Sequence, residues 1–203
     1  RFRLSGRCRG VFRLARGDRA DLDLYAENGA VTVPILQTAR LTLRPLAASD
    51  STAITEALSN WDVTRWLSQV PFPYTRADAD SFIGMVQHSP DDAHWAIDQG
   101  AGLIGLISVK PDLGYWLDQS HHGQGMMTEA ARAVLTWYFT HHTAPVLSGH
   151  FAGNAASRAI LTKLGFTDTH IETITPVNAD TPVPLQRMVL TRDHWHTLRS
   201  AAQ

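Results

Sequence analysis

The segment that most constrains the fold of this chain is residues 114–130, which reads GYWLDQSHHGQGMMTEA. An apolar run leads into a loop with two glycines, and apolar residues then recur every three or four positions, as on one face of a helix. Gly123 and Gly125 leave out side chains where a backbone must approach a ligand, and unpaired amides at a helix N-terminus attract anions. The segment therefore predicts a strand, a loop and a helix that bind a diphosphate, although a tight turn needs the same glycines for steric reasons alone.

The spacing of these glycines excludes two better-known phosphate loops. The sequence has no Gly-x4-Gly-Lys-Ser/Thr pattern of the kind that nucleoside triphosphatases use. Thr128 stands where the dinucleotide-binding pattern Gly-x-Gly-x-x-Gly needs its third glycine. Nucleotide hydrolysis and hydride transfer therefore lose support.

The composition indicates one catalytic domain in a reducing compartment. The 203 residues suffice for one sizeable core but not for two comfortable domains. The 18 lysines and arginines nearly balance the 19 aspartates and glutamates, so no overall field favours a nucleic acid or an anionic membrane surface. Cys8 is the only cysteine, and no apolar run is long enough to span a bilayer. We expect a cytoplasmic protein without a disulfide.

Residues 1–32 differ from the rest of the chain. Seven arginines lie within residues 1–19, where Asp18 is the only acid. An Arg-rich segment poor in acids is typical of organelle-targeting sequences, and it also fits a basic arm that contacts RNA or a plain, partly ordered extension. We treat residues 1–32 as a basic N-terminal extension and residues 33–203 as the catalytic domain.

The pattern of the catalytic domain predicts a mixture of strands and helices. Polar and apolar residues alternate at 40–45, as in a half-buried strand. The runs 94–98 and 103–109 flank a glycine-rich turn and predict an antiparallel hairpin. Further strands are expected at 113–117, 145–151, 166–174 and 183–190. Helix N-caps are expected at Ser49 or Asp50, at Asn60 or Asp62, at Thr75 and at Asn154.

The glycine loop resembles the acetyl-CoA pyrophosphate motif of the GNAT acetyltransferases. Its continuation at 126–130 is similar to the branch that contains the ribosomal-protein N-terminal acetyltransferases. The similarity extends, in the same order, to residues 38–46 with Asp50, 103–105, 114–117, 154–157 and 163–166. Several ordered segments agree by chance far less often than one glycine motif does, so the chain is identified as a member of this superfamily.

The resemblance implies an α/β (α+β) GNAT fold, with a mixed, mostly antiparallel sheet of about six or seven strands flanked by helices. The strand at 115–117 is expected to splay from a neighbour at 146–151, so that the pantetheine arm of acetyl-CoA inserts between them. Acetyl-CoA would be the co-substrate, and a primary amine would attack its thioester directly, without a metal ion. Adjacent histidines such as His121 and His122 point in different directions, so they do not suggest a metal site either.

Most of the cofactor-binding positions that the resemblance implies lie in the glycine-rich segment. Ser120 stands where the general motif has Gln or Arg, so the amides of residues 123–127 are expected to hold the diphosphate. The expected cofactor-binding residues are Tyr115, Trp116, Leu117, His122, Gly123, Gln124, Gly125, Met126, Met127, Thr128, Asn154, Ser157 and Lys163. The expected substrate contacts, in segments that roof the acceptor site in this family, are Trp61, Trp66, Phe72 and Tyr74.

The expected catalytic residues are Ser157, Asn154 and Glu129. Many family members use a tyrosine seven residues after the asparagine to protonate the departing thiolate, but Leu161 occupies that position here. In the resembling branch a serine three residues after the asparagine lies near the sulfur, and Ser157 matches it. Asn154 also fits a plain helix N-cap, and a carboxylate such as Glu129 is favoured near a helix N-terminus in any case. The other candidates for the base are Asp118, Asp112, His94, Tyr115 and a water-relayed proton transfer.

The function expected from these features is acetyl transfer to a primary amine, which is either a protein or peptide N-terminus or a small amine. We expect a monomer or a homodimer, with no membrane partner and with nucleic acid disfavoured. A non-catalytic acyl-CoA sensor or scaffold is an alternative, because the family tyrosine is missing. An RNA-associated protein that uses its basic N-terminus is a third hypothesis.

Overall fold

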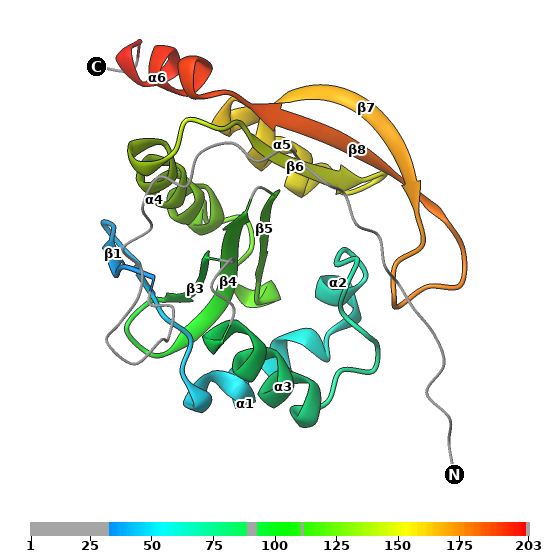
Figure 1. The fold of residues 1–203 in the computed structure, drawn as a ribbon. Coiled ribbons are helices and arrows are strands. Elements are labelled where there is room, and N and C mark those ends of the chain that lie inside the picture. The colour runs from blue at the N-terminus through cyan, green and yellow to red at the C-terminus, as the bar shows by residue number, and fades with distance from the viewer. Residues whose placement is uncertain (1–32, 89–92, 111, 202–203) are drawn as a thin grey trace.

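The structure, a computed structural model, describes residues 33–88, 93–110 and 112–201, so the expected extension at 1–32 lies outside the described residues. This part of the chain forms one sheet of eight strands in the order β1-β2-β3-β4-β5-β6-β8-β7 (Figure 1). The strands are β1 (Leu36–Gln37), β2 (Thr42–Arg44), β3 (Ala93–Asp98), β4 (Leu103–Lys110), β5 (Asp112–Leu117), β6 (Val146–Phe151), β7 (Thr167–Ile174) and β8 (Val183–Leu190). The expected fold class is confirmed, and the two-residue β1 at the edge raises the strand count above the expected six or seven.

Six α-helices flank the sheet in the described ranges. They are α1 (Ser51–Leu58), α2 (Trp61–Thr64), α3 (Arg76–Gln87), α4 (Met126–His141), α5 (Ala155–Leu164) and α6 (Arg192–Ser200). The side chains of Asn60, Thr75 and Asn154 each accept a hydrogen bond from an amide of the following first turn, as N-cap residues do. Asp50 makes no such bond to α1, because its carboxylate pairs with the guanidinium of Arg44 at 2.8 Å.

The helices lie in two layers on opposite faces of the sheet (Figure 1). Successive residues of β3 point to alternate faces, and Ala96 belongs to the buried cluster under α1, α2 and α3, whereas Trp95 and Ile97 belong to the cluster under α4. Leu161 of α5 and Trp195 of α6 join the cluster under α4. Each face of the sheet is therefore covered by its own group of helices.

The sequence patterns did not indicate α6. Most of its residues are polar or charged, and Trp195 and Leu198 are its only apolar side chains, which are too few to mark a helix in the sequence. Thr191 caps this helix by accepting a hydrogen bond from the His194 amide at 3.3 Å. No helix among the described residues is long and apolar enough to cross a bilayer.

β5 and β6 form the only parallel pair in the described part of the sheet. They pair at one position, where Asp112 lies opposite Leu147, whereas β6 pairs with β8 along its whole length. Beyond that position no ladder connects β5 to β6, so backbone groups on both strands face the gap between them. This is the place where the resemblance predicts the splayed pair.

Candidate active site

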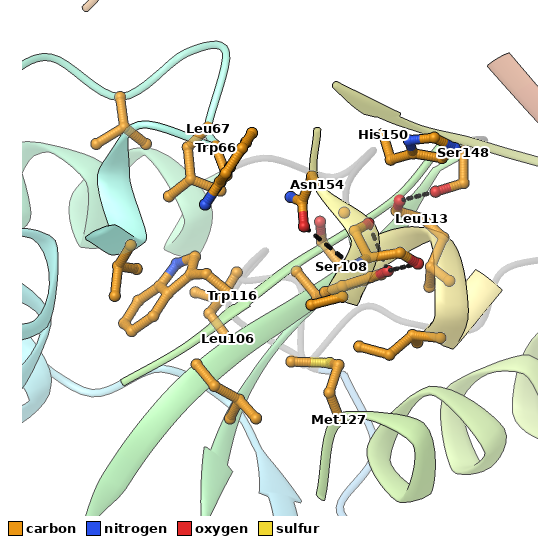
Figure 2. Close-up of a pocket in the computed structure, with 18 of the residues that line it drawn as sticks. Trp66, Leu67, Leu106, Ser108, Leu113, Trp116, Met127, Ser148, His150 and Asn154 are labelled. Atoms are coloured by element: carbon orange, nitrogen blue, oxygen red, sulfur yellow. Dashed lines mark hydrogen bonds between the residues drawn. The ribbon is translucent and has the colours of Figure 1, made fainter. Parts of the chain in front are cut away.

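A cavity of about 890 Å³ extends along the gap between β5 and β6 (Figure 2). Its walls come from these two strands, from the loop and first turn of α4, and from the start of α5. On the other side the cavity reaches α1, α2 and the turn after α2, including Ile54, Val63 and Trp66. A space of this size can hold a cofactor-sized ligand. It also connects the glycine-rich loop with the helices that cover the opposite face of the sheet.

The glycine-rich loop and the N-terminus of α4 form one end of the cavity. Gly123 and Gly125 have left-handed backbone conformations, with φ of 73° and 76°, which other residues rarely adopt. Gly125 is the N-cap of α4, so the amides that follow it have no carbonyl partner within the helix. The residues of this segment that line the cavity include Gly123, Gly125, Met126, Met127 and Thr128. Free amides at the positive end of a helix dipole suit an anion such as a diphosphate.

Arg40 brings a cation to this loop, a contact that the sequence did not indicate. Its guanidinium donates to the carbonyl oxygen of Gln124 at 3.0 Å and to the Glu129 carboxylate at 2.7 Å. Glu129 also accepts hydrogen bonds from the Thr38 hydroxyl at 2.6 Å and from the Arg40 amide at 2.9 Å. Burial tends to raise the pKa of Glu129, but the bonds from Thr38 and Arg40 outweigh it and hold that pKa below its ordinary value. Glu129 does not line the cavity, so its assignment as a catalytic residue stays a prediction that the cavity does not support.

Asn154 and Ser157 lie at the start of α5, beside the gap between β5 and β6. The Asn154 side chain accepts a hydrogen bond of 3.0 Å from the Ser157 amide and lies at the cavity (Figure 2). The Ser157 Oγ atom lies 3.0 Å from the hydroxyl oxygen of Tyr115 on β5. Burial raises the pKa of Tyr115 to about 12, although the hydrogen bond with Ser157 lowers it, so the phenol is protonated at neutral pH. The cavity thus has two hydroxyl groups at this point.

Leu161 occupies the helix position at which many family members have the acidic tyrosine. Its side chain is fully buried in the cluster under α4 and does not line the cavity. A proton donor in this cavity would therefore have to be another residue, and Ser157 and Tyr115 are hydroxyl side chains that the structure brings together there.

Trp66 bounds the other end of the cavity. A Cβ atom on Gly153 would lie 3.7 Å from the Trp66 Cη2 atom, so the indole reaches from the turn after α2 to the turn before α5 (Figure 2). The Arg65 guanidinium carbon lies 4.5 Å from the centre of this ring and covers one of its faces. Tyr74 and Phe82, which belong to the cluster under α1, α2 and α3, also line the cavity, so its lining on this side of the sheet includes several aromatic residues.

The loop between β7 and β8 holds this end of the cavity in place. The side-chain amide of Asn178 donates to the carbonyl oxygens of Thr64 at 2.8 Å and Leu67 at 3.1 Å. The Val177 amide donates to the carbonyl oxygen of Ser68 at 2.9 Å. These bonds join the turn after α2 to a loop near the other end of the chain (Figure 1). We call residues 64–70, together with this loop, the acceptor wall.

Four expected contacts lie away from the cavity. Gln124 and Lys163 have exposed side chains. Trp61 and Phe72 contact each other edge to face, with ring centres 4.9 Å apart, and each is 42% exposed. Neither pair lines the cavity, whereas the remaining expected cofactor contacts and the substrate contacts Trp66 and Tyr74 do. The assignment of Gln124, Lys163, Trp61 and Phe72 to ligands stays a prediction.

Three of the alternative base candidates line the cavity: His94, Asp112 and Tyr115. Asp112, at the start of β5, forms an ion pair with Arg187 of β8. Asp118 lies outside the cavity lining, and hydrogen bonds from Ser120 hold its pKa below its ordinary value. Within the described ranges, no group of three or more His, Cys, Asp or Glu side chains could hold a metal ion.

Comparison with known proteins identifies the class to which this fold and site belong. The sequence matches the acetyltransferase (GNAT) domain over residues 40–167, which is more than half of the chain. The chain belongs to the GNAT acetyltransferase family.

Individual relatives agree with that membership. A segment of 46 residues is 37% identical to the ribosomal-protein-serine acetyltransferase of Escherichia coli (strain K12), and it covers 20% of this chain and 26% of that protein. Among solved structures, a GNAT-family acetyltransferase from Bacillus anthracis is 17% identical, with a TM-score of 0.68 over 79% of this chain and 99% of that chain. The microcin C7 self-immunity acetyltransferase MccE, solved with acetyl-CoA and AMP, is 15% identical, with a TM-score of 0.66 over 76% of this chain and 93% of that chain. At identities this low, the solved structures show a similarity of fold alone.

Proposed function

We propose that this chain is an acetyl-CoA-dependent N-acetyltransferase that transfers the acetyl group directly to a primary amine. The observation that carries the proposal is one continuous cavity that joins the amides at the N-terminus of α4 to the hydroxyl pair of Tyr115 and Ser157. Acetyl-CoA has an anionic diphosphate at one end and a thioester at the other, and the cavity offers a complementary group for each. The related MccE structure, which contains acetyl-CoA, supports the same choice of donor.

In this proposal each part of the cavity has one task. The amides that follow Gly125 bind the diphosphate, and the facing edges of β5 and β6 pair with the amide groups of the pantetheine arm. The thioester then lies beside Ser157, and the amine approaches it from the acceptor wall. Holding both reactants in one cavity turns a bimolecular step into an effectively unimolecular one. His94 or Asp112 takes the proton that the amine loses, and a hydroxyl protonates the departing thiolate.

The acceptor is either a protein N-terminus or a small amine. The short match to the E. coli ribosomal-protein-serine acetyltransferase supports a protein N-terminus. The aromatic and aliphatic residues at the acceptor end, such as Trp66, Phe82 and Leu67, support an amine that carries an apolar group. The alternative function, binding of acyl-CoA without turnover, draws its support from Leu161 in place of the family tyrosine.

The proposal is tested by thermal unfolding with acetyl-CoA, followed by an acceptor screen in which released CoA is measured with a thiol reagent. Acetyl-CoA at about a hundred times its dissociation constant should add about 2.7 kcal/mol to the free energy of unfolding, because it binds the native state only. CoA should then be released in proportion to the acceptor that is acetylated. A stabilised protein that releases no CoA with any amine would favour the sensor, and an unfolding temperature that does not change would overturn the proposal.

A further inference from the structure

Tyr115 and Ser157 are a close hydroxyl pair built from two elements. Tyr115 belongs to β5 and Ser157 to the first turn of α5, and their oxygen atoms lie 3.0 Å apart. The phenol lies farther from the Ser157 carbonyl oxygen, at 3.4 Å, so the hydroxyl is its nearer partner. Both residues line the cavity, and the Tyr115 side chain packs against the buried cluster under α4. This packing fixes the phenol relative to Ser157.

A serine hydroxyl on its own is a poor proton donor for a thiolate. Thiols have an ordinary pKa of about 8.5, and an aliphatic alcohol is a much weaker acid. Transfer of the Ser157 proton to sulfur would therefore leave a costly alkoxide. A second hydroxyl that donates to the same oxygen stabilises the negative charge while it develops, and this effect is stronger in a site from which water is excluded.

We propose that Tyr115 is a positioning residue that acts through Ser157 during acetyl transfer, an inference that rests on the proposed function. As the bond between the acetyl carbon and sulfur breaks, its electron pair stays on sulfur, and sulfur takes the proton of Ser157 Oγ. Tyr115 donates its own proton to Ser157 Oγ at the same time. The resulting phenolate is reprotonated through solvent by the proton that the amine gave up, so charge and protons balance. The pair replaces the helix tyrosine, but its phenol comes from the strand β5.

The experiment compares the wild-type protein with Tyr115→Phe, Ser157→Ala and the double variant, using the best amine from the acceptor screen. Ser157→Ala should lower kcat roughly ten- to a hundredfold, at the low end for acid catalysis. Tyr115→Phe should lower kcat about three- to tenfold, which corresponds to the loss of one hydrogen bond. The double variant should match Ser157→Ala, because residues that act as one unit are not additive. The KM for acetyl-CoA should change less than about twofold, since a loss confined to the transition state leaves ground-state binding intact.

Tyr138→Phe is the matched control, because Tyr138 is a buried tyrosine of α4 that does not line the cavity, and it should keep the wild-type kcat. Ser157→Thr, which retains a hydroxyl, should restore most of the rate and its dependence on Tyr115, even if Ser157→Ala folds poorly. A wild-type kcat in Tyr115→Phe, or an equal loss in the wild-type and Ser157→Ala backgrounds, would overturn this inference while leaving the proposed function intact. A wild-type protein that releases no CoA with any amine would overturn both.

Discussion

Ser148 on β6 donates a hydrogen bond of 2.9 Å to the carbonyl oxygen of Leu113 on β5 (Figure 2). The bond lies one residue beyond the position where Asp112 and Leu147 pair, and both Ser148 and Leu113 are buried. A side-chain hydroxyl here takes the place of the backbone amide that a continuing ladder would have supplied. The point at which the two strands separate is therefore held by one side chain.

Ser148→Ala tests the strength of this junction. The substitution would leave the buried Leu113 carbonyl without its partner, and such a loss costs about 1–3 kcal/mol. We expect the free energy of unfolding, measured in urea, to fall by that amount. Ser200→Ala, at an exposed position of α6, should change it by less than about 0.5 kcal/mol. A value for Ser148→Ala as small as that of the control would contradict a role for this bond in holding the junction.

Gly125→Ala tests the proposed anion site at the N-terminus of α4. A Cβ atom there would lie 3.7 Å from Arg40 Nη2, an ordinary contact, so any loss of binding comes from the approach of the ligand and from backbone strain at a φ of 76°. We expect the affinity for acetyl-CoA, measured by titration calorimetry, to fall at least tenfold.

Gly100→Ala is the control for strain in that experiment. Gly100 also has a positive φ, of 99°, but it lies in the turn between β3 and β4, where an added Cβ atom would have no other atom within 4 Å. This variant should lose about 1 kcal/mol of stability and retain its affinity for acetyl-CoA. If both variants bind acetyl-CoA as the wild type does, the diphosphate lies elsewhere.

Trp66→Ala tests the acceptor wall. Removing the indole opens the end of the cavity that faces Gly153, so we expect the KM for the amine to rise about tenfold, equivalent to about 1.4 kcal/mol of lost contact. The KM for acetyl-CoA should change little. Trp61→Ala removes a half-exposed tryptophan that contacts Phe72 and does not line the cavity, and it should raise the KM for the amine less than Trp66→Ala does. The reverse pattern, with Trp61 affecting the amine and Trp66 not, would place the acceptor on the outer surface of α2.

Glu129→Gln tests whether this carboxylate has a structural role. The pKa of Glu129 in the folded protein lies below its ordinary value of 4.5. The ionised carboxylate therefore stabilises the folded protein fully above pH 4.5, and this stabilisation is lost as the pH falls through the folded pKa. The partner Arg40 is partly exposed, so the loss at neutral pH should be below about 1 kcal/mol.

The unfolding temperature of Glu129→Gln should therefore fall by a few degrees relative to wild type at about pH 7, and the difference should be smaller at a second pH below the ordinary pKa of 4.5. Glu56→Gln, at an exposed position of α1, serves as the control and should match wild type at both values. A difference for Glu129→Gln that grows as the pH falls would have the wrong sign for this ion pair.

Features with a local cause could be predicted from the sequence. Asn60, Thr75 and Asn154 cap helices because each side chain bonds an amide only two or three residues away. Likewise, the left-handed conformations of Gly123 and Gly125 follow from their place between a strand and a helix. The strand–loop–helix arrangement of this segment was therefore predictable, and its role as an anion site stays a prediction.

Contacts between distant residues could not be predicted in this way. Tyr115 and Ser157 are separated by 42 positions, and α4 and β6 lie between them in the sequence, so no local pattern brings them together. Arg40 meets Glu129 across 89 positions, so nothing near Glu129 in the sequence shows that its carboxylate is already paired. Trp61 and Trp66 have similar local patterns, and only the path of the turn after α2 decides that Trp66 lines the cavity.

The acceptor wall shares no segment with the glycine-rich loop that starts α4. Its two parts, the turn after α2 and the loop between β7 and β8, meet through bonds from Asn178 and Val177. Surface loops accept insertions and substitutions far more readily than the elements they connect. A related chain can therefore accept a new substrate through changes in these two loops alone, while the segments proposed to bind acetyl-CoA stay the same.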